Sequence, residues 1–341
     1  MKYIRPFLCI ALSLSLLSCK GAEVPQPKDE PHTTNQEKEP EPEIEPEPDK
    51  VSLDGKTFIF CGNSMLYYGG IVANGGQKGT DAGMFYTLLK KSGVTGHRVI
   101  DCTYGGHHLC DFGEGGCIFT DKHGSDGKTS SGGCPGIGYD LIGGIDLSTV
   151  DYVIISEAGN NYSHFYDDAK TLFERFTKVN PDAKLVYINH IYSVYKKHTN
   201  VLGKLKDLHD NLGVTIVNCG QLAYDIYTKA ISVPGGSVQY SDRYTFCNHA
   251  GSDTYHPNPL MGYIMTRMLY CALTGEKAEG AEYSSLVKGT MYGASAAVSY
   301  SAYYDKYYSG NPAAVPFMTV IDNEKEMSGI HQLIPLYIDK Y

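Results

Sequence analysis

The sequence predicts an α/β fold in which a parallel β-sheet carries helices on both faces. Short, uninterrupted apolar runs recur along residues 57–218, as expected of strands that are buried on both sides. Between these runs lie segments whose apolar side chains repeat at helical spacing. Strands that alternate with helices form a parallel sheet, and its active groups are expected at the carboxyl ends of the strands.

The first expected strand covers residues 57–61 and ends at Gly62, where the chain can turn tightly. A helix over 80–92 is indicated by helically spaced Met84, Phe85, Leu88 and Leu89 before Gly93. Further patterns predict strands over 97–102, 151–156, 184–189 and 214–218, a helix that ends near Asn180, a helix over 201–212, and a last helix over 259–273 that stops at Gly275.

Two segments interrupt this alternation. Residues 105–144 are Gly-rich and without periodicity, which is typical of a functional insertion, here expected over the site. Residues 276–341 form a Tyr-rich extension with a possible strand over 315–321. We expect this extension either to pack beside the domain or to present a carbohydrate-binding surface, with packing favoured.

The amino-terminal residues 1–18 have the pattern of an export signal. Lys2 and Arg5 precede an apolar run over 7–17 that is too short to remain as a membrane span. The run ends in Leu-Leu-Ser-Cys, which resembles the lipobox at which bacteria attach lipid to a cysteine, here Cys19. The alternative is an ordinary secretory signal with a chance cysteine. We expect an exported protein that is lipid-anchored to a bacterial membrane, at the outer membrane or cell surface.

Residues 19–54 are expected to be a disordered Pro/Glu-rich linker that leads into a folded domain over 55–275. The linker also explains most of the acidity. Residues 20–50 carry a net charge of minus six and the signal carries plus two, which leaves minus five of the total minus nine for the rest. So mild an acidic balance, without a basic stripe, argues against nucleic acid as a partner.

Ten cysteines suit an exported chain, in which disulfides can form. With Cys9 removed and Cys19 lipidated, eight remain. Cys102, Cys110, Cys117 and Cys134 lie close together in sequence, so a bridge within the insertion is plausible, although the pairing stays open. The chain has no C-x-x-C pair, which disfavours zinc.

Three polar blocks each follow an expected strand, and a fourth precedes the last expected helix. They are Gly62-Asn63-Ser64, Gly105-Gly106, Gly159-Asn160-Asn161 and the run Asp253 to Asn258, which contains His256. All four are expected at one edge of the sheet. Acyl transfer needs such a set, because it requires a hydroxyl nucleophile, a base, a carboxylate that orients the base, and donors aimed at an oxyanion.

These blocks, in this order, resemble the SGNH (GDSL) hydrolases over about residues 56–275. The resemblance implies a flavodoxin-like three-layer α/β/α sandwich with a five-stranded parallel sheet. It implies Ser64 as nucleophile, His256 as base and Asp253 as its orienting carboxylate, with an oxyanion hole from the Ser64 backbone, Gly106 and Asn161. It implies neither metal nor organic cofactor.

The chain departs from the family pattern at two positions. Asn63 stands where the family usually has Asp. Tyr162 stands where the family usually has an Asp after the asparagine of the third block, which is Asn161 here. Asn160 is an alternative to Asn161, and Gly105 to Gly106. Taken singly, each block has an ordinary structural explanation as a turn, a helix cap or a buried histidine. Their joint order favours catalysis.

Histidines cluster in sequence beside the expected oxyanion glycine. His97, His107, His108, Asp111 and His123 could form a metal site, but their spacing favours substrate contact, above all by His107, or solvation. Asn63 and Asn160 are further candidates for substrate contact. The sequence therefore predicts an esterase acting on acyl, above all acetyl, groups of glycans. A non-catalytic glycan-binding lipoprotein is one alternative, and a lipase or thioesterase is another.

Overall fold

The computed structural model describes residues 50–72, 79–112, 141–157, 163–240, 243–248, 255–278, 286–287, 292–293, 296–297 and 316–341. The signal segment, Cys19 and the linker up to residue 49 lie outside these ranges. Among the described helices, none has the length and apolar character needed to cross a bilayer.

A six-stranded sheet with the order β2-β3-β1-β4-β5-β6 forms the centre of the fold. Its strands are β1 (Thr57–Cys61), β2 (Gly79–Thr80), β3 (Arg98–Asp101), β4 (Tyr152–Ile155), β5 (Lys184–Ile188) and β6 (Thr215–Val217). Only the edge strand β2 is antiparallel. The predicted five-stranded parallel sheet is therefore confirmed. Its five strands have the chain order 2-1-3-4-5 of flavodoxin-like folds. Strand β2 was not predicted, because two residues carry no pattern.

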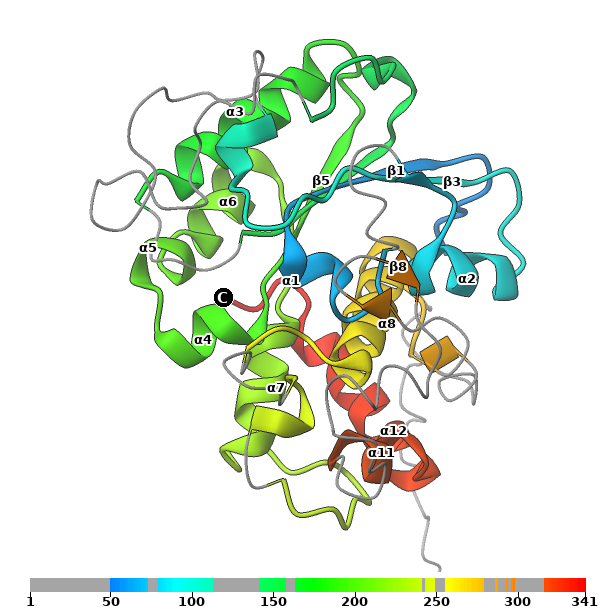
Figure 1. Ribbon diagram of the computed structural model, residues 1–341, viewed down its shortest axis with the longest axis vertical. Coiled ribbons are helices and arrows are strands. Elements are labelled where there is room, and N and C mark those ends of the chain that lie inside the picture. The colour runs from blue at the N-terminus through cyan, green and yellow to red at the C-terminus, as the bar shows by residue number, and fades with distance from the viewer. Residues whose placement is uncertain are drawn as a thin grey trace, which may run out of the picture. The chain divides into compact units, whose positions relative to one another are not determined.

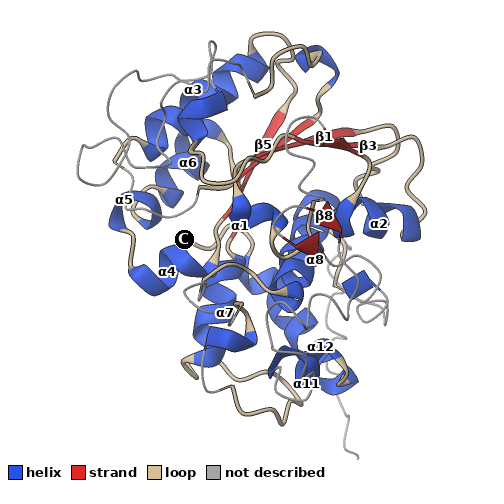
Figure 2. Cartoon of the chain, viewed as in Figure 1, coloured by secondary structure: helices blue, strands red, loops and turns tan. Residues whose placement is uncertain are grey.

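Helices cover both faces of this sheet (Figures 1 and 2). Along β1, Phe58 and Phe60 enter one core and Ile59 and Cys61 the other. The second core contains α3 (Phe165–Thr177), α5 (Thr199–Leu202) and α6 (Leu205–Leu212). The first core contains α1 (Ser64–Tyr67), α2 (Gly83–Lys91), α4 (Ile191–Lys196), α7 (Cys219–Tyr227), α8 (Pro259–Thr274), α11 (Pro316–Ile321) and α12 (Glu324–Leu333).

Two sequence predictions for single elements are wrong. The helix expected over 201–212 is broken at Gly203, and α5 and α6 lie on either side of the break. The strand expected over 315–321 is helix α11. Its Phe317, Val320 and Ile321 are buried at helical spacing, and Pro316 suits the first turn of a helix. Packing against α8 and α12 overrides the strand preference of this β-branched run.

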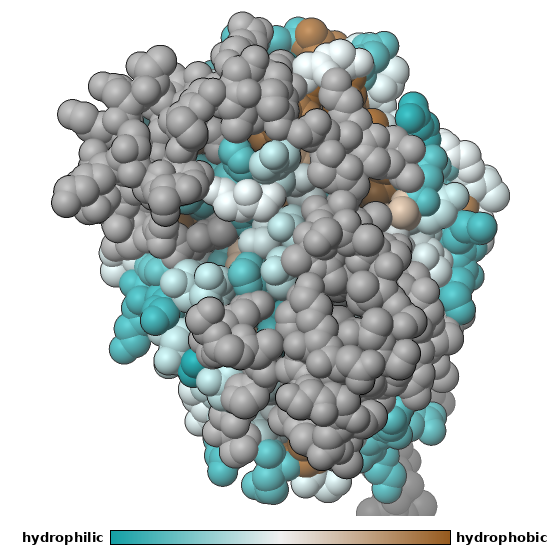
Figure 3. Space-filling model, in the orientation of Figure 1, coloured by the Kyte–Doolittle hydropathy of each residue, from teal (hydrophilic) through white to brown (hydrophobic). Residues whose placement is uncertain are grey.

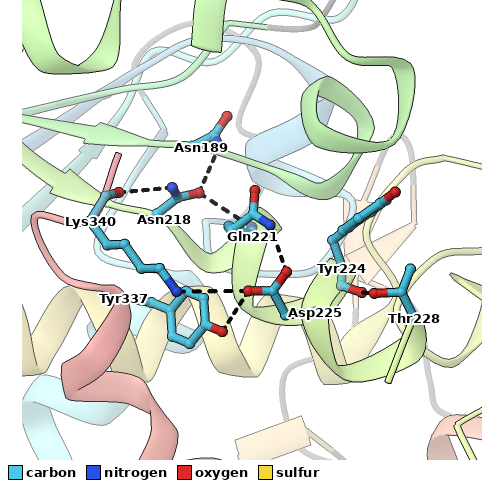
Figure 4. Close-up of polar contacts among 8 residues, drawn as sticks. All are labelled: Asn189, Asn218, Gln221, Tyr224, Asp225, Thr228, Tyr337 and Lys340. Atoms are coloured by element: carbon cyan, nitrogen blue, oxygen red, sulfur yellow. Dashed lines mark hydrogen bonds and ion pairs between the residues drawn. The ribbon is translucent and has the colours of Figure 1, made fainter. Parts of the chain in front are cut away.

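The last residues of the chain run antiparallel along β6. Ile338 bridges Val217, and Ile216 N–H donates to Asp339 over 2.7 Å. Figure 4 shows the polar network that accompanies this pairing. Asn218 accepts from Asn189 (2.7 Å) and donates to the Lys340 carbonyl (2.8 Å), while the Tyr337 hydroxyl donates to Asp225 (2.7 Å). Tyr337 is buried, so this part of the Tyr-rich extension completes the domain.

Candidate active site

The turn after β1 presents Ser64 at the carboxyl end of the central strand. Gly62 is required there, because a Cβ atom on it would lie 2.8 Å from the Ser156 carbonyl oxygen of the strand beside it. Asn63 then caps α1, and its Oδ1 accepts from Met65 N–H over 3.2 Å. As the first residue of α1, Ser64 has an N–H that the helix itself does not use.

Ser64 Oγ and His256 Nε2 lie 2.8 Å apart, although 192 residues separate them in sequence. Both side chains are partly buried. At this distance the hydroxyl can donate to a neutral imidazole whose proton is on Nδ1. This is the geometry that a hydroxyl nucleophile and its general base require.

A short antiparallel pairing fixes His256 in front of α8. Asn248 N–H donates to the His256 carbonyl (2.9 Å), and Asn258 N–H donates to the Phe246 carbonyl (3.1 Å). The Asn258 side chain caps α8 through Met261 N–H and donates to the Thr245 carbonyl over 2.8 Å. The polar run before the last helix therefore positions the imidazole as well as starting the helix.

Tyrosine rings surround the imidazole. Tyr68 stacks on the His256 ring at 4.0 Å between centroids, and Tyr255 at 4.8 Å. Tyr192 of α4 continues the series at 4.4 Å from Tyr255, and burial raises the pKa of its hydroxyl. Sequence reasoning missed these three residues. The high tyrosine content of the chain was a signal, but composition does not indicate which tyrosines contact one another.

The turn after α1 and helix α8 approach each other at two glycines, Gly69 and Gly262. A Cβ atom on Gly262 would lie 1.8 Å from the Gly69 carbonyl oxygen, which no side chain could accommodate without movement. This close crossing brings the turn with Ser64 next to the start of α8 and therefore next to His256 (Figure 1).

The loop after β3 presents the two candidate oxyanion glycines. Both are exposed, and each position favours glycine for a different reason. Gly106 has a φ of +78°, whereas a Cβ atom on Gly105 would lie 2.6 Å from the Tyr67 hydroxyl. The loop is joined to the nucleophile turn because Asn63 Nδ2 donates to the His107 carbonyl over 2.8 Å.

The two histidines of this loop are buried, so solvation, one of the two alternatives expected for them, is wrong, and substrate contact stays a prediction. His107 is 8% exposed and packs edge-on against Tyr104 at 4.3 Å. His108 is 5% exposed, and its Nδ1 lies 2.6 Å from Glu157 Oε1. Within the part of the chain that the structure describes, no group of three or more His, Cys, Asp or Glu residues could hold a metal ion.

Several predicted residues lie outside the described ranges. They are Asp253, Asn160 and Asn161, together with Tyr162 and His123. Of the four cysteines around the insertion, Cys102 and Cys110 are buried, and Cys117 and Cys134 lie outside the described residues. The roles of Asp253 and Asn161 therefore stay predictions.

No protein-family model matches the chain, and no curated protein matches its sequence. Among solved structures, it is similar to a protein described as a GDSL-like lipase from Parabacteroides merdae (14% identity, TM-score 0.41, 67% of this chain and 99% of that one). It is also similar to a carbohydrate esterase family 2 enzyme from Corynascus thermopiles (12%, 0.37, 66% and 67%). A third is a family two carbohydrate esterase from Clostridium thermocellum in complex with cellohexaose (14%, 0.34, 63% and 62%). These likenesses are distant, and the chemistry of the site rests on its own residues.

Proposed function

We propose that the protein is an SGNH-type serine ester hydrolase that removes acyl groups, above all acetyl groups, from glycans. The observation that carries the proposal is the 2.8 Å contact between Ser64 Oγ and His256 Nε2 at the carboxyl edge of a parallel sheet. A serine and a histidine this close, with backbone donors beside them, can perform acyl transfer.

In the proposed mechanism His256 takes the proton of Ser64 as its oxygen attacks the ester carbonyl. The Ser64 and Gly106 N–H groups, with Asn161, stabilise the oxyanion. His256 then protonates the leaving alcohol, and water hydrolyses the acyl-enzyme. Asp253 holds the imidazole in the required tautomer, and the stacked Tyr68 and Tyr255 rings restrict the orientation of the imidazole.

The character of the surface supports a polar substrate over a lipid. The described residues on the face in Figure 3 are mostly hydrophilic or intermediate. A lipase would be expected to offer a contiguous apolar surface, whereas the exposed large apolar side chains of the described residues are Val51, Val179, Tyr195, Leu336 and Tyr341. The tyrosines beside His256 suit sugar rings, since their faces are apolar and their hydroxyls polar.

Hydrolysis of p-nitrophenyl acetate and of acetylated polysaccharides tests the proposal. The wild-type protein should turn over, and Ser64→Ala and His256→Ala should each lower kcat/KM by about 10³-fold or more while unfolding at the wild-type temperature. A folded protein that is inert on a broad ester panel, and that a fluorophosphonate does not label, would contradict the proposal. It would favour a glycan-binding protein instead.

Lipid anchoring of the protein at a membrane is a separate proposal. Diacylation of Cys19 would hold the domain at a bacterial membrane through the linker. Metabolic labelling with an alkyne fatty acid should mark the wild-type chain and Cys9→Ser but not Cys19→Ser. Label that persists on Cys19→Ser would exclude this anchor.

A further inference from the structure

The end of β4 carries a buried carboxylate, Glu157, that the proposed mechanism does not use. Its exposure is 0%, and it lies two residues before the block Gly159-Asn160-Asn161. Taking a carboxylate out of water is costly unless several donors compensate, and an apolar residue would satisfy the core more easily. The position therefore needs an explanation other than packing.

Both oxygens of Glu157 are occupied by the loop that contains Gly105 and Gly106. Oε1 lies 2.6 Å from His108 Nδ1, and Oε2 accepts from Leu109 N–H over 3.0 Å. A carboxylate only accepts, so His108 donates from Nδ1. The contact with His108 is short, and hydrogen bonds to a buried carboxylate are stronger than those at the surface.

The backbone of Glu157 is fixed independently. His190, at the end of β5, lies with Nε2 2.6 Å from the Glu157 carbonyl oxygen. Burial lowers the pKa of His190 to about 4, so at neutral pH it is uncharged and donates from Nε2. Glu157 thus has a fixed position from which to hold the loop.

The loop that contains Gly105 and Gly106 is therefore held by residues that follow two strands, β1 and β4. On one side Asn63 Nδ2 holds the His107 carbonyl, and on the other Glu157 holds His108 and Leu109. Gly106 lies just before these anchors, exposed and with its φ of +78°. Gly105 and Gly106 are the central residues of a turn that His107 N–H closes by donating to the Tyr104 carbonyl over 3.3 Å, so the direction of this turn depends on how its ends are anchored.

We propose that Glu157 is a positioning residue that, through His108, holds the Gly105–Gly106 loop where its N–H groups can receive the oxyanion. This inference rests on the proposed esterase function. An oxyanion donor acts in the transition state more than in the ground state, so a loosened loop lowers kcat and leaves KM nearly unchanged.

The test compares Glu157→Gln with a matched control. The amide keeps the size of the side chain but turns an N–H towards one of the two donors, which releases part of the loop. Glu157→Gln should lower kcat about tenfold to hundredfold, change KM less than about threefold, and speed hydrogen exchange of the amides of residues 104–109. The control is Glu326→Gln, because Glu326 is also fully buried and accepts from Ser237, Val238 and Tyr240. It should lose stability and retain kcat.

A second pair of variants covers the case in which Glu157→Gln does not fold. In His108→Asn the side-chain amide takes the place of Nδ1 and can still donate, whereas His108→Leu keeps volume without a donor. His108→Asn should stay within about threefold of wild-type kcat and His108→Leu should lose about tenfold or more. Equal kcat for both, or wild-type kcat and exchange in folded Glu157→Gln, overturns the inference and leaves the esterase proposal intact. A wild-type protein without turnover or fluorophosphonate labelling overturns both.

Discussion

At the scale of single residues, Asn63 makes two contacts of opposite kind. Its Oδ1 accepts from Met65 N–H and its Nδ2 donates to the His107 carbonyl, and the side chain is 1% exposed. An aspartate could make the first contact but would place a carboxylate oxygen against the carbonyl in the second. Asparagine at position 63, where the family usually has Asp, therefore suits the His107 carbonyl, which needs a donor at this place.

We predict that Asn63→Asp destabilises the protein by about 2 kcal/mol and lowers kcat by about tenfold, because a buried oxygen loses its donor and the loop shifts. Chemical denaturation and p-nitrophenyl acetate hydrolysis measure the two effects. The control is Asn323→Asp, because Asn323 caps α12 only by accepting from Lys325 and Glu326 N–H groups. It should change stability by less than about 0.5 kcal/mol. Equal effects of the two substitutions would show that the donor of Asn63 is unimportant.

At the scale of elements, the crossing of the turn after α1 with helix α8 decides whether the nucleophile meets its base. Ser64 begins α1, and His256 lies three residues before Pro259, the first residue of α8. The turn and the helix contact backbone to backbone at Gly69 and Gly262. A shift between them would therefore lengthen the contact between Ser64 and His256.

Gly262→Ala tests this dependence. Alanine is intrinsically better than glycine in a helix by about 1 kcal/mol, yet overpacking at the crossing should give a net loss of about 1–3 kcal/mol. The kcat should fall by about tenfold or more. The control is Gly329→Ala on α12, where a Cβ atom would lie 2.3 Å from the Pro234 carbonyl oxygen. It should lose stability and keep kcat, and an equal loss of kcat in both variants would contradict a specific role of the crossing. Thermal unfolding and ester hydrolysis provide the measurements.

At the scale of the whole molecule, two buried histidines couple folding to pH. Burial lowers the pKa of His190 to about 4, and burial with the charge of Arg267 lowers that of His331 to about 4 as well. Each is below the ordinary value of 6.5. Between these values the unfolded chain binds protons that the folded chain does not, so stability rises with pH across this window and is lost as pH falls from about 6.5 to about 4.

The free energy of unfolding should fall by about 3 kcal/mol for each histidine between pH 7 and pH 4.5. The two histidines together should lower Tm by about 10 °C over this range. Differential scanning calorimetry across this range measures it. His331→Gln, which keeps a polar group beside the Tyr263 hydroxyl, should remove about half of the pH dependence. A Tm that is constant over this range would contradict the prediction.

Local patterns in the sequence predicted the five parallel strands and their alternation with helices. These patterns sufficed for β1, β4 and β5, because strands buried on both faces are mostly apolar. The end of α8 at Gly275 was predictable because glycine readily adopts the left-handed backbone conformation that ends a helix, and Gly275 has this conformation. Ser64 and His256 could be named in advance because their sequence blocks resemble those of the SGNH hydrolases, and the expected parallel sheet places such blocks at one edge.

Features that depend on contacts between distant residues could not be predicted from the sequence. Strand preference at 315–321 lost to packing against α8, and the crossing at Gly69 and Gly262 has no local signature. Glu157 looks like any charged residue after a strand until its donors, His108 and Leu109, are placed. The physical reason is the same throughout: periodicity reports which side of an element is buried, whereas hydrogen-bond partners and close approaches depend on where the rest of the chain lies.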